Sequence, residues 1–553
     1  MLLLPRSLLI GAALLTLAAC APEHTAPAPA SAEDTTAAAR RIEADLRFLA
    51  DDLLEGRETG TRGYDLAALY VASEFRKLGL EPAAARSYLQ PVPLLRARAV
   101  REGARFALVR DGQTRELAFE QDYVPSANFN EASSEISAPL VFVGQAVHAP
   151  ELGQDHFAGV DVRGKIAVLL ANAPSSLSND ERAFHASRME KARLLAERGA
   201  IGTISIGDPR DEEKRPWALG AKNWGAAGMR LRAGDGRAID SFPELRVRVS
   251  LRATLAEAIF AGSPHSADEV FAMMRENRLK PFDLPGTATL TQATRMEAAE
   301  SFNVVARLAG TDATLAAEHV VLTAHLDHLG IGAEIDGDAI YNGALDNAIG
   351  VSILLEAARR MATTAEGPRR SLLFVALTGE EKGLLGAQQF VATPPVAKGS
   401  IVANVNMDMP VVLGDLVDMV PIGIEHSSLK GLVEAAATDM GMALSPDPKP
   451  EETVFVRSDQ YAFIRAGIPA VYLDSGVKGR DPHFDGIASL DGFLDQHYHR
   501  PSDDANQSIH YPTAARVAAL NALIGQRIAD APQRPSWNEG DFFAKKFAQP
   551  AAD

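Results

Sequence analysis

The second half of the chain alternates short, fully apolar segments with segments of helical periodicity, and this alternation constrains the fold more than any other feature. The continuous apolar runs lie at residues 320–323, 372–377, 401–405 and 470–473. Amphipathic helical patterns occupy the intervals and the end, at residues 349–361, 429–439 and 514–528. A strand that is apolar on both sides must be covered on both faces. The pattern therefore predicts an α/β fold whose sheet lies between layers of helices.

The length and the charge of the chain limit the functions that are open to it. A chain of 553 residues is longer than one hydrophobic core supports, so about two to four domains are expected. The formal net charge is −17, and the Lys and Arg residues form no cluster along the sequence. Binding of nucleic acid needs such clusters because phosphates must be neutralised, so we expect no nucleic-acid partner.

The amino terminus resembles an export signal that ends at the only cysteine of the chain. Residues 8–19 are apolar, follow Arg6 and are too few to span a bilayer comfortably. Residues 17–20, Leu-Ala-Ala-Cys, resemble the end of a bacterial lipoprotein signal, in which the cysteine is diacylated and becomes the first mature residue. We therefore expect export and a membrane anchor at Cys20. Because Ala21 and not Asp follows the cysteine, we expect the anchor in the outer membrane, facing the periplasm. The alternative is an ordinary secretory signal that contains a cysteine.

Changes in composition divide the rest of the chain into segments. Residues 159–166, Gly-Val-Asp-Val-Arg-Gly-Lys-Ile, resemble part of the protease-associated domain that some peptidases carry as an insertion. The alternative is an enlarged loop of the main domain. The expected segments are a signal peptide (1–20), a flexible tether rich in Ala, Pro and Thr (21–37), the N-terminal part of the main domain (38–134), a β-rich protease-associated insert (135–260), the catalytic part of the main domain (261–530) and an aromatic tail that no motif explains (531–553).

Five polar motifs lie directly after predicted strands or in loops near glycine. In open α/β sheets, ligands and metals gather at these places. The motifs are His325-Leu-Asp327-His328, Asp346-Asn347, Gly379-Glu380-Glu381, Asn406-Met-Asp408 and Tyr498-His499.

Most of these motifs have an ordinary explanation when each is taken alone. His325 could be a solvated loop histidine, Asp346 could cap the helix that follows it, and the Glu380–Glu381 pair could be a solvated acidic turn. Asp408 is different, because it ends an apolar strand, where a carboxylate must be paired, hydrogen-bonded or bound to a metal. Two adjacent glutamates also fit a division of roles, in which one binds a cation and the other acts as a general base.

Together and in this order, the five motifs resemble the metal centre of the di-zinc aminopeptidases in the zinc-exopeptidase superfamily. Glutamate carboxypeptidase, glutaminyl cyclase and the transferrin receptor ectodomain belong to the same superfamily. The resemblance covers most of residues 40–525 and includes residues 56–63, 457–459 and 467–469. It implies a three-layer α/β/α sandwich with a mixed, mostly parallel sheet, two Zn²⁺ ions and peptide substrates.

The resemblance also implies a role for each polar residue. One zinc would be held by His325 and Asp408, the other by Glu381 and His499, and Asp346 would bridge them. Two such cations can polarise the scissile carbonyl and activate water.

Further roles follow from the same resemblance. Glu380 would be the general base and acid, Tyr498 would help to stabilise the oxyanion, and Asp327 would hold His325 in place. In relatives the peptide bond after the bridging aspartate is cis, so the Asp346–Asn347 bond is predicted to be cis. Arg457 is a candidate substrate contact.

The sequence leaves several functions of this superfamily open. Removal of N-terminal residues from peptides is the expected activity. A carboxypeptidase would need a basic pocket for a terminal carboxylate, to which Arg457 could contribute. A glutaminyl cyclase generally uses one metal, and a receptor-like protein has no reason to keep the ligands and Glu380. Leu345 and Gln460 stand where many relatives have an acidic residue and a histidine, and His328 and His497 lie beside the predicted ligands.

Overall fold

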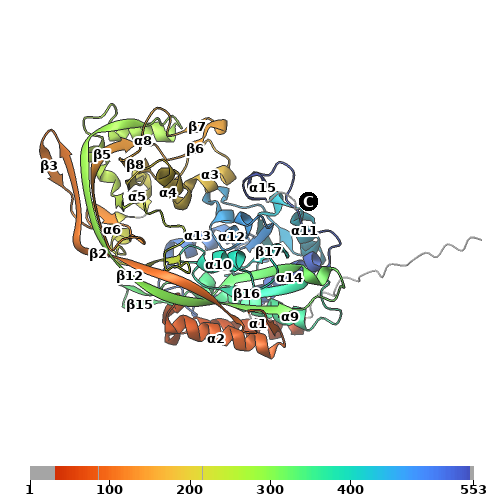
Figure 1. Ribbon diagram of the computed structural model, residues 1–553. Helices are drawn as coiled ribbons and strands as arrows, with labels where there is room; N and C mark the ends of the chain where they lie inside the picture. The colour runs from red at the N-terminus through yellow and green to blue at the C-terminus, as the bar shows by residue number, and fades with distance from the viewer. Residues whose placement is uncertain (1–31, 85, 215, 549–553) are drawn as a thin grey trace, which may run out of the picture.

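One mixed β-sheet runs through the whole molecule and is shared by two lobes (Figure 1). The structure is a computed structural model and describes residues 32–84, 86–214 and 216–548. The predicted signal, Cys20 and residues 21–31 of the predicted tether lie outside the described residues. Within the described ranges, no helix combines the length and the apolar character that a membrane span requires.

The first lobe contains the apolar strands that the sequence predicts, in the order β19-β18-β20-β17-β13-β16-β12. Neighbours among β20, β17, β13 and β16 are parallel, whereas β18 is antiparallel to β20 and β12 is antiparallel to β16. The sheet is therefore mixed, with a parallel centre, as predicted. The strands are β12 (Phe282–Leu308), β13 (His319–His325), β16 (Ser371–Leu377), β17 (Ile401–Asn406), β18 (Asp418–Ile422), β19 (Ala443–Leu444) and β20 (Ala470–Asp474).

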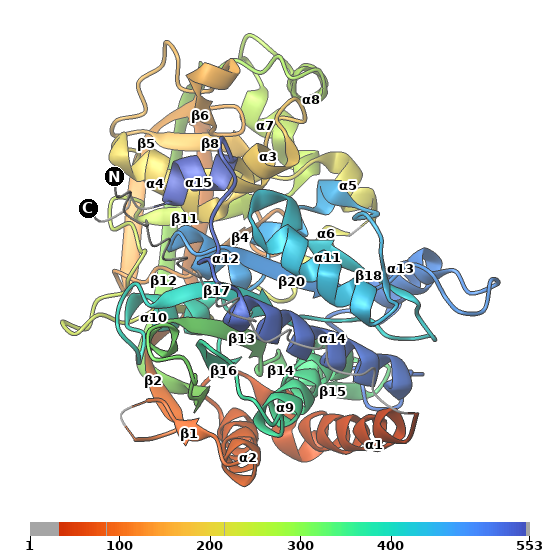
Figure 2. The ribbon, with the colours of Figure 1, turned by 90° about the vertical axis from the view of Figure 1, so that its right-hand side faces the viewer.

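Helices cover both faces of this part of the sheet, which confirms the predicted three layers. Side chains alternate along β13, so that Leu322 packs into one apolar core and Val321 into another on the opposite face. Figures 1 and 2 show one layer of helices on the outer face and a smaller one toward the second lobe. The outer layer is α1 (Ala32–Leu49), α2 (Arg62–Lys77), α9 (Ile349–Ala362), α11 (Leu429–Asp439) and α14 (Tyr511–Asp530); the other includes α10 (Leu385–Ala392) and α12 (Gln460–Arg465).

Helix α1 begins earlier than the sequence predicts. Residues 32–37, predicted as part of the tether, belong to the first turns of this helix. The segment is rich in alanine, the best helix former, and Glu33 and Asp34 place negative charge at the helix amino terminus. Composition alone describes this stretch poorly, because the same alanines suit a tether and a helix.

The second lobe continues the sheet through β12-β5-β8-β9-β11-β4, with helices packed on it. The two larger apolar cores of this lobe are built around Phe142 and Phe260 and around Val141 and Leu195. Its elements are β3 (Gln113–Glu116), β4 (Tyr123–Pro125), β5 (Ser133–Phe142), β8 (Ile166–Leu170), β9 (Gly202–Ile206), β10 (Gly228–Leu231), β11 (Val247–Leu251), α3 (Asn179–Ala186), α4 (Arg188–Glu197), α5 (Pro209–Lys214), α6 (Trp217–Ala221), α7 (Ala256–Phe260) and α8 (Ala267–Arg275).

Two very long antiparallel strands, β2 (Leu89–Arg110) and β12, connect the lobes. Their ladder runs from Leu89 paired with Val304 in the first lobe to Val109 paired with Thr287 in the second. The larger core of the second lobe therefore takes in Phe106 and Leu290, which lie outside the segment 135–260 assigned to the insert from sequence.

The remaining elements are short or lie at the edges. The hairpin of β14 and β15 stands beside the carboxyl end of β13, and the C-terminal helix α15 packs against α3 and α12 (Figure 2). These elements are β1 (Glu81–Pro82), β6 (His148–Ala149), β7 (Gln154–Asp155), β14 (Gly330–Ile335), β15 (Asp338–Tyr341), α13 (Gly486–Gln496) and α15 (Phe542–Phe547).

Candidate metal centre

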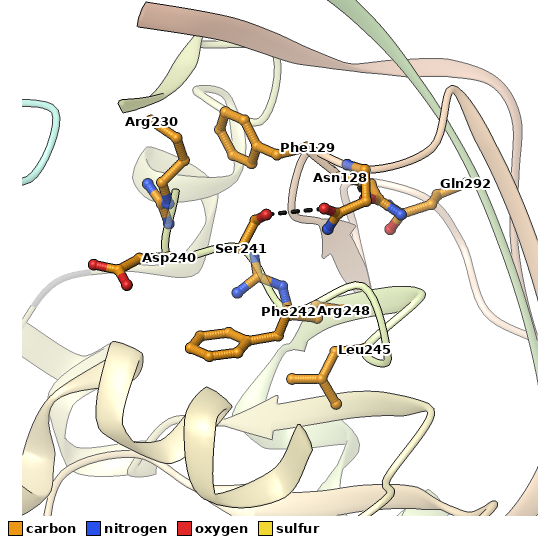
Figure 3. A pocket seen from close by; sticks show the side chains of 10 residues that line it. Asn128, Phe129, Arg230, Asp240, Ser241, Phe242, Leu245, Arg248 and Gln292 are labelled. Carbon is orange, nitrogen blue, oxygen red and sulfur yellow. Dashed lines mark hydrogen bonds between the residues drawn. The ribbon is translucent and has the colours of Figure 1, made fainter. Parts of the chain in front are cut away.

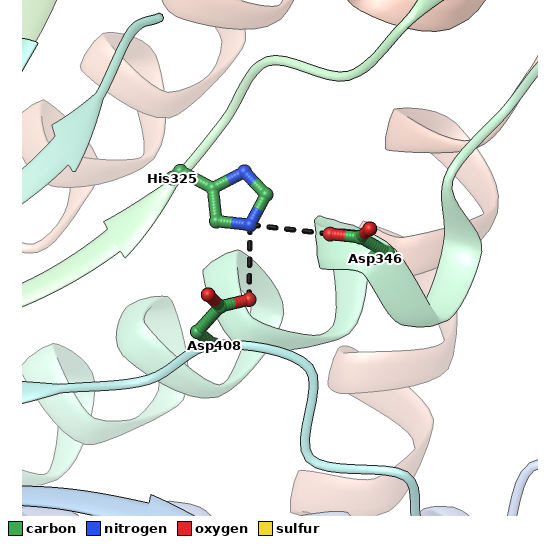
Figure 4. Close-up of side chains that lie close together, drawn as sticks. All are labelled: His325, Asp346 and Asp408. Carbon is green, nitrogen blue, oxygen red and sulfur yellow. Dashed lines mark hydrogen bonds and ion pairs between the residues drawn. The ribbon is translucent and has the colours of Figure 1, made fainter. Parts of the chain in front are cut away.

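Three of the predicted ligands converge where the parallel strands end. His325 is the last residue of β13, Asp408 follows the neighbouring strand β17, and Asp346 precedes α9. The Nε2 atom of His325 lies 3.0 Å from Oδ1 of Asp408 and 3.2 Å from Oδ1 of Asp346. Figure 4 shows the three side chains pointing toward one another from separate elements. One imidazole and two carboxylates form the donor set that zinc accepts.

A second group of ligands lies on the other side of Asp346. The Nε2 atom of His499 lies 3.2 Å from Oδ2 of Asp346 and 3.3 Å from Oε2 of Glu381. The two oxygens of Asp346 thus face different groups, Oδ1 toward His325 and Oδ2 toward His499. This is the geometry that a bridging carboxylate needs.

His328 also belongs to this second group, although the sequence assigned it no role. Its Nδ1 atom lies 2.8 Å from Oε1 of Glu381 and 3.9 Å from Oδ2 of Asp346. The ring is fully buried, and its short contact with Glu381 lacks the geometry of a hydrogen bond, so neither ring nitrogen has a hydrogen-bond partner among the described residues. Oε1 of Glu381 is also buried without a hydrogen bond, so the donor set fits a cation at this position.

Local backbone structure places the bridging carboxylate. The Asp346–Asn347 peptide bond is cis, which confirms the prediction. The Asn347 side chain accepts from the backbone N–H groups of Gly350 and Met409, both at 3.0 Å. The carboxylate of Asp503 accepts from the backbone N–H groups of Leu345 at 2.9 Å and Asp346 at 3.0 Å. These bonds hold the turn that presents Asp346.

Asp327 and Glu380 lie directly beside the ligands. The contact between Asp327 and His325 is made by the main-chain oxygen of Asp327, 3.1 Å from Nδ1, and not by the carboxylate. That carboxylate accepts from the hydroxyl of Thr59 at 3.0 Å and from the backbone N–H of Glu380 at 3.1 Å. Asp327 therefore orients the histidine through its backbone and the Glu380 loop through its side chain.

Arg57 is a buried cation that joins the loops of the centre. Its guanidinium donates to the main-chain oxygens of Leu326 at 2.9 Å, Asn342 at 2.6 Å and Gly343 at 3.0 Å, and also to that of Leu49. Burial lowers the pKa of Arg57 to about 10, while the surrounding carboxylates act in the opposite direction. Arg57 thus connects the segments that carry the metal-facing residues.

The surroundings of Glu380 and Asp346 shift the pKa values of these two carboxyl groups in opposite directions. Burial raises the pKa of Glu380 well above its ordinary value, and the nearby carboxylates of Asp408 and Glu381 raise it further. Burial acts in the same direction on Asp346, but hydrogen bonds from His325 and His499 outweigh it and hold the pKa of that carboxyl well below its ordinary value. Asp346 is therefore anionic, and Glu380 is the group prepared to carry a proton.

A cleft of about 870 Å³ opens between this centre and the second lobe. Glu380, Glu381 and Tyr498 line the end at the centre. Tyr498 stacks on His499 with ring centroids 3.8 Å apart, which places its ring beside the second ligand group. Arg457 also lines the cleft, half-exposed and paired with Glu452 at 3.1 Å.

The structure thus brings the predicted ligands together with Glu380, Asp327 and Tyr498, and it adds Arg57, His328 and Asp503. The sequence contained a signal for His328, which stands three residues after His325. It contained none for the hydrogen bonds of Arg57 and Asp503, because both depend on loops that meet only in the folded chain.

Comparison with known proteins identifies this part of the chain. Residues 303–524 match the family model of peptidase family M28. The chain carries a peptidase family M28 domain. The M28 domain is that of a zinc peptidase, and the match covers the residues from β12 through most of α14.

Curated relatives of the chain are distant or short matches. A probable zinc metalloprotease of Pyrenophora tritici-repentis is 42% identical over 76 residues, 14% of this chain and 17% of that protein. A glutamate carboxypeptidase 2 homolog of Caenorhabditis briggsae is 24% identical over 336 residues, 53% of this chain and 40% of that protein. The matches therefore span less than half of each relative.

The fold is also that of a solved structure. An aminopeptidase from Aneurinibacillus sp. strain AM-1 superimposes with a TM-score of 0.53 at 18% identity, over 90% of this chain and 96% of the other. Because this comparison covers both lobes, the two-lobed architecture is shared as well as the zinc-exopeptidase fold.

Proposed function

We propose that this M28 peptidase is a two-zinc aminopeptidase that hydrolyses the first peptide bond of its substrates. The observation that carries the proposal is the position of Asp346 between two ligand groups, one oxygen facing each. His325 and Asp408 would hold one zinc, and Glu381 and His499, with His328 beside them, would hold the other. Two zinc ions, when bound, supply a Lewis acid for the scissile carbonyl and a lowered pKa for water.

The side chains around the ligands supply the proton transfers. Glu380 lies at the wall of the cleft, and its backbone N–H is fixed by Asp327. Its carboxylate takes the proton of the attacking water and delivers it to the departing amine. Tyr498, also in the wall, can donate its hydroxyl hydrogen to the oxygen that becomes negative at the carbonyl.

The charge of the centre favours an amino terminus over a carboxyl terminus as the end that is bound there. The acidic side chains at the centre outnumber the positive charges of two dications and of the Arg57 guanidinium, so a free carboxylate would meet more acidic groups there than an α-ammonium group would meet basic ones. These acidic side chains are Asp327, Asp346, Glu380, Glu381, Asp408, Asp459 and Asp503.

An assay with paired substrates tests the proposal. The protein should cleave leucine p-nitroanilide, and acetylation of the leucine amine should abolish cleavage. Elemental analysis of the purified protein should give two zinc ions per chain. Cleavage of N-acetylated peptides at their carboxyl terminus would indicate a carboxypeptidase, a single zinc would favour a cyclase, and absence of zinc would favour a receptor-like protein.

Export and the anchor are proposals from the sequence alone. We propose that the chain is lipidated at Cys20 and lies on the periplasmic side of the outer membrane. Mass spectrometry of the mature amino terminus should find a diacylated cysteine, and Cys20→Ala should release the protein into the soluble fraction.

A further inference from the structure

The far wall of the cleft, on the second lobe, carries a group of arginines without acidic partners. Arg188 at the start of α4, Arg230 on β10 and Arg248 on β11 line the same cleft as Glu380. We call these three residues the arginine wall. Among the described residues, none of the three has a carboxylate within 4.0 Å, although many other arginines of the chain have one.

Arg248 is the clearest example of a residue of the arginine wall without a partner among the described side chains. Its guanidinium is half-buried and has no hydrogen-bond or ion-pair partner among the described side chains. Burial, together with the charges of Arg230 and Arg188, lowers its pKa to about 10. A cation held in a repulsive and partly dehydrated position is stabilised by an anion from outside.

The groups around Arg230 complete the pocket. Its guanidinium lies 4.9 Å from the ring centre of Phe129 and donates to the main-chain oxygen of Met229 at 2.8 Å. Asp240 is the acidic side chain in this part of the wall, and it forms no ion pair with Arg230 within 4.0 Å. Figure 3 shows Arg230 and Arg248 turned toward the same space, between the rings of Phe129 and Phe242.

One end of the cleft is therefore acidic and the other end is basic. Carboxylates gather at the metal centre and unpaired arginines at the second lobe, in a protein whose formal net charge is −17. A short peptide with a free amino terminus and a free carboxyl terminus has the matching polarity. Its ammonium group is attracted to the first end and its carboxylate to the second.

We infer that the arginine wall binds a carboxylate at the far end of the substrate, so that the enzyme prefers short peptides with a free carboxyl terminus or an acidic residue beyond the cleaved bond. This inference rests on the proposed aminopeptidase function and names its substrate class. The carboxylate would accept hydrogen bonds from Arg248 and Arg230, and Arg188 would add long-range attraction.

Three synthetic peptides separate the possible sources of the carboxylate. They are Leu-Ala-Ala with a free carboxyl terminus, the same peptide as its amide, and Leu-Ala-Asp amide. We expect kcat/KM for the free acid to exceed that for the neutral amide by about tenfold to a hundredfold, the scale of hydrogen bonds to a charged group. A gain for Leu-Ala-Asp amide alone would assign the site to an acidic side chain, which the inference includes.

Variants of the wall test whether the arginines cause the preference. Arg248→Gln should lower the ratio of the two kcat/KM values, free acid over amide, by about tenfold, and Arg188→Gln at the exposed edge should lower it less. The matched control is Arg105→Gln, which removes the same charge from the second lobe at an exposed residue paired with Glu116. This control should leave the ratio unchanged.

The outcomes distinguish this inference from the proposed function. If the amide is cleaved as well as the free acid and as well as Leu-Ala-Asp amide, the inference is wrong and the aminopeptidase stands. If the free acid is preferred but the ratio is the same in Arg248→Gln and Arg188→Gln, the wall is not the cause and the inference also fails. If no peptide with a free amino terminus is cleaved, the proposed function fails and the inference fails with it.

Discussion

At the scale of single residues, adjacent glutamates have different surroundings and should respond differently to the same substitution. Glu381 faces His499 and His328, whereas Glu380 lies in the cleft wall and has an elevated pKa because of burial. Glu380→Gln should retain two zinc ions and lose at least about a hundredfold in kcat, because the acid–base group is gone. Zinc analysis and steady-state kinetics on the same preparations measure both effects.

Glu381→Gln is the matched comparison for that variant. It removes the same charge one residue later and should lower the zinc content as well as the activity. Zinc loss in Glu380→Gln, or undiminished kcat, would show that the two roles are assigned the wrong way round.

Lys191 gives the second lobe a pH-dependent stability. Its side chain is buried in α4, donates to the main-chain oxygen of Asn172, and has a pKa that burial lowers to about 7. Between this value and the ordinary lysine pKa, the unfolded chain binds more protons than the folded one, so stability rises with pH across that window. At pH values below the folded-state pKa, Lys191 is protonated in both the folded and the unfolded chain. Folding then buries the charge at its full cost in free energy.

Lys191→Met removes this dependence. Relative to the variant, the unmodified protein should gain about 3 kcal/mol of unfolding free energy between pH 7 and pH 9.5. Urea unfolding followed by tryptophan fluorescence measures it, because Trp217 and Trp224 both lie in the second lobe. Lys222→Met, at an exposed residue of this lobe, is the control. A difference that stays constant with pH would contradict the prediction.

Three of the ligands, His325, Glu381 and Asp408, could be found from the sequence because each ends or follows a strand that its apolar composition reveals. His325 ends an apolar run, and Asp408 follows another, so their meeting at one sheet edge is a consequence of parallel strands. Arg57 could not be found in this way. Its hydrogen bonds join Leu326 and Asn342, segments that are remote in sequence, and an arginine between glycine and glutamate in a loop has no local pattern.

At the scale of elements, the C-terminal tail contacts both lobes and holds them together; we call these contacts the clasp. Helix α15 buries Phe543 edge-on against the rings of His426 and Phe455, which stack on each other in the first lobe. The neighbouring rings of Phe542 and Phe547 contact Phe184 of the second lobe. These contacts give a role to an aromatic segment that no sequence motif explained.

Truncation of the central ring should weaken this clasp. Phe543→Ala should cost about 3–5 kcal/mol of unfolding free energy, since the ring is fully buried. It should also speed proteolytic cleavage of the tail. Differential scanning fluorimetry and timed trypsin digestion measure these effects, with Lys545→Ala at an exposed position of the same helix as control. Equal stability of the two variants would exclude the clasp.

Strand β12 is a long element that the sequence analysis did not predict, and its burial pattern explains why. Strands β13, β16 and β17 are buried on both faces and were visible as apolar runs. Strand β12 alternates buried and partly exposed positions and uses Ala, Thr and Gln for many of them, so it lacks the continuous apolar run that marked the other strands. Its length is set by pairing with β2 and not by its own composition. Sequence patterns thus identify fully buried strands more easily than strands that cross between two cores.

At the scale of the whole molecule, the shared strands decide how the lobes can be separated. Removal of residues 135–260 alone would leave the ends of β2 and β12 without their core, exposing Phe106 and Leu290. That protein should aggregate. A cut within the ladder is different, because Arg98 pairs with Arg295, and an Asn-Gly turn can join two paired residues of an antiparallel hairpin.

The protein in which Asn-Gly replaces residues 99–294 should therefore fold and bind zinc. Leu94 would lose its cover from β10, so Leu94→Thr accompanies the excision. Every proposed ligand and Glu380 remain, whereas the arginine wall is absent. This protein should cleave leucine p-nitroanilide and treat Leu-Ala-Ala and its amide alike, since the far end of the cleft no longer attracts a carboxylate. Size-exclusion chromatography, zinc analysis and the paired peptide assay measure the three properties. A folded, zinc-containing product that still prefers the free acid would place the carboxylate site in the first lobe, and an insoluble product would show that the second lobe is required for the first to fold.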